Sequence, residues 1–386
     1  MDYSRASWTR FDRRAEELLI TCMKKDAVGS RAREIAGLIR SGADLRAAGN
    51  MAAAKGVSWL AYRALIFFTP SDDKGREAMR ALQVSCGTSS VANEYYKEEL
   101  KRVLRYFSER GIAVIPLKGI ALAERLYGDV AARDRSVDTD LLVKEKDRER
   151  GAAALKELGY IPAYAGETEA YEWCRTFHNP KKNMIELHWD ITMMVRSPER
   201  IEGLWRGARP RQWEGVSFYD LEPAELLLYL AAHLVNSDSF RHLKYLCDID
   251  RLIGKYGNEI EWDSLIAKAV EWRLSGSLYT ALKVTGDILG TDFPEDELRR
   301  LRVSFPKKIF IRAFAGRSVV FRSRVRRRIL DKFLSYILFE IMEANSLKDH
   351  VNIFKRVLFP PREMMENRTY FGRFCNGVRR LFNKDV

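Results

Sequence analysis

The spacing of apolar residues changes twice along the chain. Residues 1–110 carry apolar side chains at helical intervals, most clearly from Ser90 to Arg110, where they fall on one face. From Ile112 onward, short apolar runs of strand length alternate with helical stretches, and after Pro210 the spacing is helical again. The pattern predicts three regions, which are an N-terminal helical region (1–110), a central α/β unit (111–215) and a C-terminal helical region (216–386).

The central region is predicted to form a mixed sheet with helices, which gives an α+β fold class. Gly111, Gly128 and Gly159 are expected to end the helices that precede them. The expected elements, in chain order, are strand 113–117, a helix from Ile120 to Leu126, strand 137–143, a helix from Lys146 to Leu158, extended segments at 160–164 and 172–177, and strand 184–191.

Further helices are expected in the C-terminal region. Pro223 is well placed to start one that runs through Leu234, because proline suits the first turn of a helix. Others are predicted from Phe240 to Ile253, from Asp263 onward, and in a basic tail after residue 361. We find no internal repeat and no low-complexity linker, so the three regions are expected to pack into one body.

Two carboxylates stand two residues apart on the predicted strand 137–143. Successive side chains of a strand point to opposite faces, so Asp138 and Asp140 project from the same face. Carboxylates held side by side repel each other, and a divalent cation that binds both relieves the repulsion. Mg²⁺ fits best, since it binds through one or two carboxylates together with substrate phosphates. Solvated strand faces and turns also carry Asp-x-Asp, so the pair needs further support.

The last predicted strand of the central region supplies that support. Its apolar and polar residues alternate, so Glu186, His188 and Asp190 share the face opposite to the core. If the two strands are neighbours, Glu186 can complete a cluster with Asp138 and Asp140. The alternative interpretation is the ordinary polar outer face of a sheet.

Lys118 and Gly119 lie where a predicted strand passes into a helix. A glycine there lets a phosphate approach the backbone, the helix N-terminus supplies N–H donors, and Lys118 supplies a positive charge. The Lys-Gly order, without an upstream glycine at the required spacing, excludes a Walker A loop. A simple turn is the alternative.

The positive charge of the chain is unevenly distributed. The formal net charge is +13, and the segment 299–332 holds thirteen Lys or Arg residues against one acid, Asp331. Such a segment can bind a polyanion such as RNA. Its interleaved apolar residues equally fit amphipathic helices with a solvated basic face.

The composition and the start of the chain argue against a membrane-spanning protein, a secreted protein and a fold held by disulfides or zinc. No apolar run reaches the length of a membrane span, and the charged start of the chain does not fit a signal peptide, so a cytoplasmic location is expected. The five cysteines are widely spaced and odd in number, which favours neither a disulfide framework nor a structural zinc site.

Together, these elements resemble the nucleotidyltransferase superfamily to which DNA polymerase beta belongs. They look most like its bacterial branch of uncharacterised nucleotidyltransferase family proteins. The resemblance implies a nucleotidyltransferase-type mixed sheet flanked by helical regions. The stretches that carry it are residues 115–119, 138–143, 158–160 and 186–189, with flanks at 54–60 and 242–249.

The resemblance also implies a reaction, in which a nucleoside monophosphate passes from an NTP to a hydroxyl-bearing acceptor and pyrophosphate is released. Two Mg²⁺ ions, with Mn²⁺ as the alternative, would be held by the catalytic residues Asp138, Asp140 and Glu186. The nucleotide-binding residues that it implies are Lys118, Gly119, Arg133, Arg135, His188, Lys244 and Asp248.

Some of these residues have a second interpretation. Arg133 and Arg135 are alternatives for one triphosphate contact. His188 equally fits a structural role, and Lys244 and Asp248, four residues apart on one helix face, equally fit an intrahelical ion pair.

Two other functions stay open on the same fold. The superfamily usually has a Gly-Ser or Gly-Gly pair where this chain has Gly119 and Ile120, which motivates a noncatalytic nucleotide-binding or partner-binding protein. The second is an RNA-directed nucleotidyltransferase that uses the segment 299–332 as its RNA platform.

Overall fold

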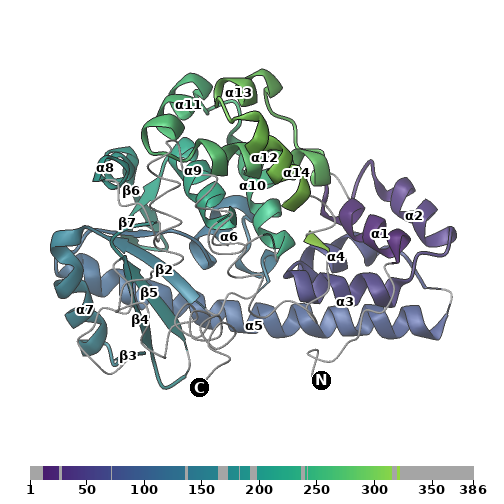
Figure 1. Ribbon diagram of the computed structural model, residues 1–386. Helices are drawn as coiled ribbons and strands as arrows, with labels where there is room; N and C mark the ends of the chain where they lie inside the picture. The colour runs from purple at the N-terminus through teal and green to yellow at the C-terminus, as the bar shows by residue number, and fades with distance from the viewer. Residues whose placement is uncertain are drawn as a thin grey trace, which may run out of the picture.

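A computed structural model describes much of the chain (Figure 1). Arg135, much of the basic segment 299–332 and the predicted tail helix lie outside the described residues. Among the residues that the structure describes, no helix is long and apolar enough to cross a membrane. The described residues are 12–25, 28–70, 72–134, 138–163, 173–181, 183–191, 198–235, 240, 242–314 and 320–321.

Helices make up the N-terminal region, as predicted. The first four are α1 (Arg13–Met23), α2 (Ala32–Arg40), α3 (Leu45–Lys55) and α4 (Ser58–Leu65). The long α5 (Asp73–Glu109) follows and begins well before Ser90, because the Asp72 side chain caps it by accepting a hydrogen bond from the Gly75 backbone N–H. Figure 1 shows α5 running from the N-terminal helices to the sheet, so one helix connects the two parts of the molecule.

The central region forms the expected mixed sheet. Its strand order is β1-β2-β5-β4-β3, in which β2 and β5 pair in parallel and the other neighbours are antiparallel. The strands are β1 (Val114–Pro116), β2 (Asp138–Val143), β3 (Ile161–Pro162), β4 (Cys174–His178) and β5 (Met184–His188). The helical elements between them are α6 (Ile120–Tyr127), the 3₁₀ turns η2 (Val130–Ala132) and η3 (Glu145–Asp147), and α7 (Arg148–Glu157).

Strand β5 is shorter than the predicted strand 184–191. It ends at His188 because the backbone N–H groups of Trp189 and Asp190 both donate to the carbonyl of Trp173. Trp189 and Asp190 thus both lie opposite the single residue Trp173, which interrupts the regular ladder of hydrogen bonds between the strands.

The prediction of helical spacing directly after Pro210 was wrong. A β-hairpin lies there, formed by β6 (Ala208–Trp213) and β7 (Val216–Leu221), and α8 (Pro198–Gly207) precedes it. Glu214 and Gly215 make the turn with φ values of 47° and 78°, which suit a tight hairpin turn. From Val216 to Tyr219 in β7, buried and exposed residues alternate with the period of a strand.

The rest of the described chain is helical. Helix α9 starts at Pro223, as predicted, but α10 begins three residues after Phe240, because the φ of Phe240 is 59° and a left-handed residue cannot continue a helix. The helices are α9 (Pro223–His233), α10 (Leu243–Tyr256), α11 (Trp262–Glu271), α12 (Ser275–Leu289), α13 (Glu295–Arg300) and α14 (Phe305–Phe314).

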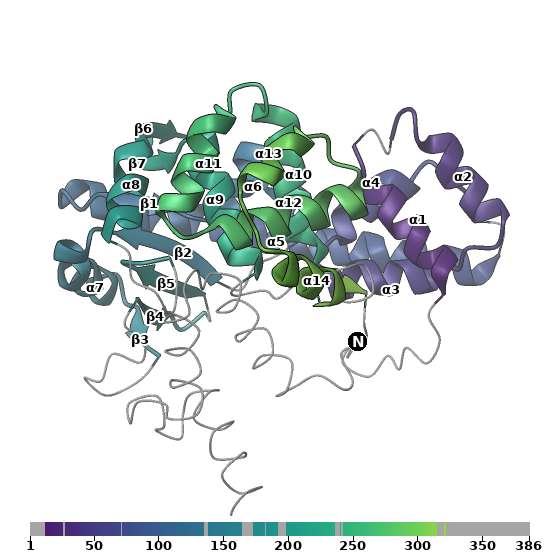
Figure 2. The same ribbon diagram turned by 45° about the horizontal axis from the view of Figure 1, so that its top comes forward.

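Two hydrophobic clusters lie on opposite faces of the sheet. One packs Leu141 and Leu187 against Phe107 of α5. The other joins Leu142 to buried residues of the N-terminal and C-terminal helices. Asp140 and Leu142 point to the same face of the sheet. The carboxylates of β2 therefore face the C-terminal helices, which lie on the opposite side of the sheet from α5 (Figure 2).

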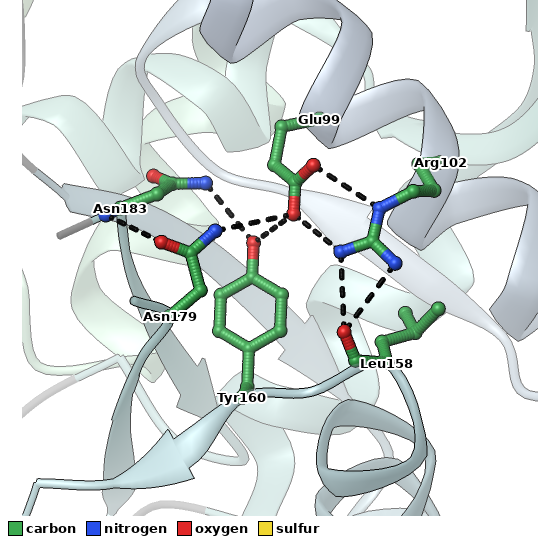
Figure 3. A network of polar contacts seen from close by, with 6 residues as sticks. All are labelled: Glu99, Arg102, Leu158, Tyr160, Asn179 and Asn183. Atoms are coloured by element: carbon green, nitrogen blue, oxygen red, sulfur yellow. Dashed lines mark hydrogen bonds and ion pairs between the residues drawn. The ribbon is translucent and has the colours of Figure 1, made fainter. Parts of the chain in front are cut away.

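A buried polar network attaches the far end of the sheet to α5 (Figure 3). The Tyr160 hydroxyl donates to Glu99 Oε1 at 2.7 Å, and Asn183, just before β5, donates to the Tyr160 oxygen at 3.0 Å. Burial alone would raise the pKa of Glu99, but Arg102 and Tyr160 outweigh it and hold this pKa below its usual value. The network therefore fixes the start of the strand that carries Glu186 and His188.

Candidate active site

Strands β2 and β5 bring the predicted carboxylates together. In their parallel register Asp140 lies opposite Glu186, and Leu142 lies opposite His188. Asp140 is buried at 2% exposure, whereas the side chain of Asp138 is 25% exposed. The expected adjacency of Asp140 and Glu186 is therefore present.

Lys118 lies between the two aspartates of β2. It follows β1, whose end is held to β2 by a 2.9 Å hydrogen bond from the Leu117 N–H to the Asp140 carbonyl. Lys118 Nζ lies 2.8 Å from Asp138 Oδ2 and 3.1 Å from Asp140 Oδ2. Burial alone would lower the pKa of Lys118, but the two carboxylates raise it well above its usual value. The two ion pairs thus favour the charged form of Lys118 inside the carboxylate cluster.

The two oxygens of Asp140 have different surroundings. Oδ2 receives Lys118 and a 3.2 Å hydrogen bond from the Tyr229 hydroxyl of α9. Oδ1 is buried without a hydrogen-bond partner among the described residues and lies 3.9 Å from His188 Nε2. Burial alone would raise the pKa of Asp140, yet the charges of Lys118 and His188 hold it far below its usual value.

Asp140, Glu186 and His188 could hold a metal ion. Each offers one ligand atom, and the three atoms lie within 4.8 Å of one another. Glu186 Oε2 is 3.4 Å from His188 Nε2, and both ring nitrogens of His188 lack a hydrogen-bond partner in the described part of the chain. Two carboxylate oxygens and one imidazole nitrogen fit a divalent cation, and the Asp140 carboxylate has a buried oxygen, Oδ1, without a hydrogen-bond partner among the described residues.

This set of ligand atoms differs from the predicted one in one member. His188, which we assigned to nucleotide binding, lies among the candidate ligands, and the carboxylate of Asp138 contacts Lys118 instead. The role of Asp138 as a ligand stays a prediction. Burial alone would lower the pKa of His188, but Asp140 and Glu186 raise it to about 9.

Gly119 begins α6 beside the carboxylates. Its φ of 83° lies in the left-handed region, which favours glycine, and a Cβ there would come 3.8 Å from the Asp138 carbonyl. With Ile120, Asp138, Arg133 and Asn93 it lines a small hollow at the helix N-terminus. Its contact with phosphate stays a prediction.

Arg133 and Asp248 are paired with each other. Arg133 Nε lies 3.0 Å from Asp248 Oδ2, and the Tyr127 hydroxyl donates to Asp248 Oδ1 at 3.0 Å. Both charged residues are buried, with 4% and 0% exposure. The pair joins the loop before β2 to α10, and the predicted nucleotide contact of each residue stays a prediction.

Lys244 lies one turn before Asp248 on α10. It is buried at 8% exposure, and burial together with the nearby charge of Arg133 lowers its pKa to about 8. Gly56, at the end of α3, leaves room for it, since a Cβ at Gly56 would come 3.1 Å from Lys244 Cδ. Residues 54–60 and 242–249, the two flanking stretches that carry the family resemblance, thus contact each other beside the site.

Three contacts at the site were not foreseen from the sequence. Tyr229 bonds to Asp140, the Asn93 amide donates to the Arg133 carbonyl at 2.8 Å, and Asp134 accepts from the Ser58 N–H at 2.9 Å. These partners lie between 40 and 89 positions apart in the chain, so no local pattern indicates them.

Comparison with known proteins places the chain in a family. The family model described as uncharacterised nucleotidyltransferase matches residues 41–290, which include the central sheet, the carboxylates and α9 to α12. Among curated proteins and solved structures, no significant match was found. Because the family model covers more than half of the chain, the protein belongs to the uncharacterised nucleotidyltransferase family.

Proposed function

We propose that the protein transfers a nucleoside monophosphate from an NTP to a hydroxyl-bearing acceptor, in a reaction that depends on Mg²⁺. The observation that carries the proposal is the cluster of Asp140, Glu186 and His188 beside Asp138 and Lys118, in a chain of a nucleotidyltransferase family. The cluster combines ligands for a cation with fixed charges, which are the groups that phosphoryl-transfer chemistry requires.

The residues of the site have separate roles in this proposal. Asp140, Glu186 and His188 would hold the divalent cation, which polarises the α-phosphate and neutralises charge on the triphosphate. Asp138, the partly exposed aspartate, orients the acceptor hydroxyl and takes its proton. Lys118 holds both aspartates in place through its two ion pairs and helps to keep the pKa of Asp140 below its usual value.

The bond changes follow from this arrangement. The acceptor oxygen attacks the α-phosphorus, the bond to the bridging oxygen of the β-phosphate breaks, and pyrophosphate leaves with the electron pair. The protein contributes positioning and electrostatics. The N–H groups at the start of α6 and the ammonium of Lys244, whose charge interacts with that of Asp138, would contact the phosphates.

Pyrophosphate release tests the proposal. The full chain is incubated with each NTP and with candidate acceptors that carry a hydroxyl group, with Mg²⁺ or with EDTA. Release that requires the divalent cation is expected. Tight NTP binding that is independent of Mg²⁺, without turnover of any NTP, would instead favour the noncatalytic nucleotide-binding protein.

Lys244 is expected to make nucleotide binding depend on pH. At pH 9 only about a tenth of an ammonium with a pKa near 8 keeps its proton, so the Kd for NTP should rise about fivefold or more between pH 7 and pH 9. Calorimetry at the two pH values measures this change.

Two variants show whether Lys244 is the cause of the pH dependence. Lys244→Gln lacks the charge at both pH values, so its binding should be weak and nearly independent of pH. Lys283→Gln, on the exposed surface of α12, is the control and should follow the wild type. A Lys244→Gln protein with the wild-type pH profile would show that Lys244 does not contact the nucleotide.

A further inference from the structure

A positive charge already lies between the two aspartates of β2. Lys118 is 3% exposed, and its ammonium contacts Asp138 Oδ2 at 2.8 Å and Asp140 Oδ2 at 3.1 Å. A cation that bridges these carboxylates would have to displace Lys118. The displaced ammonium would be left in a buried place without its two ion pairs, which is energetically costly.

Asp140 divides the cluster into two cation positions. Its Oδ2 faces Lys118 and Tyr229, so the first position is filled by the protein itself. Its Oδ1 is buried, has no hydrogen-bond partner among the described residues and lies 3.9 Å from His188 Nε2, the nitrogen that is also 3.4 Å from Glu186 Oε2. Among the described residues, the buried atoms of the cluster that lack a hydrogen-bond partner, Asp140 Oδ1 and the two ring nitrogens of His188, all belong to this second position.

The charges of the cluster agree with this division. Asp138, Asp140 and Glu186 carry three negative charges, and Lys118 returns one positive charge. With His188 in the neutral form that a metal ligand requires, two negative charges remain. One divalent cation balances them, whereas two such ions would leave a buried excess of positive charge.

We propose that the protein by itself holds one divalent cation, on Asp140, Glu186 and His188, and that the ammonium of Lys118 takes the place of a second ion between Asp138 and Asp140. Any further cation enters with the triphosphate. The inference rests on the proposed function only in placing a metal ion at this site, and it replaces the two protein-bound ions that the sequence resemblance implies.

Titration with Mn²⁺ in the absence of nucleotide tests the proposal. Free Mn²⁺ is followed by electron paramagnetic resonance with the full chain, and one bound ion per chain is expected. Glu186→Gln and His188→Gln should each weaken its binding by about 100-fold. The matched control is His178→Gln, an exposed histidine on β4, which should bind Mn²⁺ as the wild type does.

The variant Asp138→Asn distinguishes a cation site that includes Asp138 from one in which Asp138 only pairs with Lys118. If Asp138 belongs to the Lys118 position, this variant keeps one Mn²⁺ with an affinity changed by less than about tenfold. Lys118→Met, which removes the ammonium, should allow a second Mn²⁺ between the aspartates. Circular dichroism checks that each variant is folded, and Asp138→Asn decides the question if Lys118→Met does not fold.

Three results would overturn the inference. They are two Mn²⁺ ions in the wild type, loss of the single ion in Asp138→Asn, or no bound Mn²⁺ at all. Pyrophosphate release measured on the same preparations judges the proposed function separately. A protein that binds two ions and releases pyrophosphate contradicts only this inference, whereas one ion without transfer of any NTP contradicts only the reaction.

Discussion

Replacing Asp140 by asparagine is expected to lower kcat for nucleotidyl transfer by about 10³-fold or more. Asp140 contributes one oxygen to the candidate metal ligands and the other to Lys118 and Tyr229. An amide in its place removes the negative charge that both positions use. The rate of pyrophosphate release at saturating NTP and Mg²⁺ measures the effect.

The control for this variant is Asp73→Asn, in the first turn of α5, where the side chain is 97% exposed. It should keep the wild-type rate. Both proteins are compared at a temperature where circular dichroism shows them folded, because Asp140→Asn also removes an ion pair from the buried Lys118. An Asp140→Asn protein with more than about a tenth of the wild-type kcat would rule out this carboxylate as a catalytic group.

The second large effect is expected on stability. Asp248→Asn should lower the free energy of unfolding by about 3–5 kcal/mol, because it leaves the buried guanidinium of Arg133 without its counter-charge. Denaturation by urea, followed by circular dichroism, measures the change.

Two comparisons isolate the cause. Asp287→Asn removes an exposed carboxylate, paired with Lys283 within α12, and should change the free energy of unfolding by less than about 0.5 kcal/mol. The double variant Arg133→Met, Asp248→Leu removes both buried charges and should recover much of the loss. If Asp248→Asn proves as mild as Asp287→Asn, the buried pair does not stabilise the fold.

The local elements around the site could be predicted because their signals are local. Alternation along β2 and β5 indicated which side chains share a face, and Gly119, Gly128 and Pro223 marked helix ends that the structure confirms. The hairpin at 208–221 was missed because its signal is short, and it lies next to long helical stretches.

Long-range partners could not be predicted in this way. Nothing in the sequence around Tyr229 indicates that its hydroxyl reaches Asp140, 89 residues away. The pairing of Arg133 with Asp248 likewise joins segments 115 residues apart, although each was singled out for another role. Such contacts depend on how the C-terminal helices pack over the sheet, and periodicity carries no information on that.

The pair Asp138 and Asp140 illustrates the difference between what the local sequence determines and what the tertiary structure decides. By itself, the sequence determined that both carboxylates leave β2 on one face, because the period of a strand is two residues. Only the tertiary structure decided that they have different neighbours, since the end of β1 places Lys118 between them and β5 places Glu186 and His188 beside Asp140 alone. Strand geometry is a local property, whereas the charge that faces each carboxylate is set by the packing of distant segments.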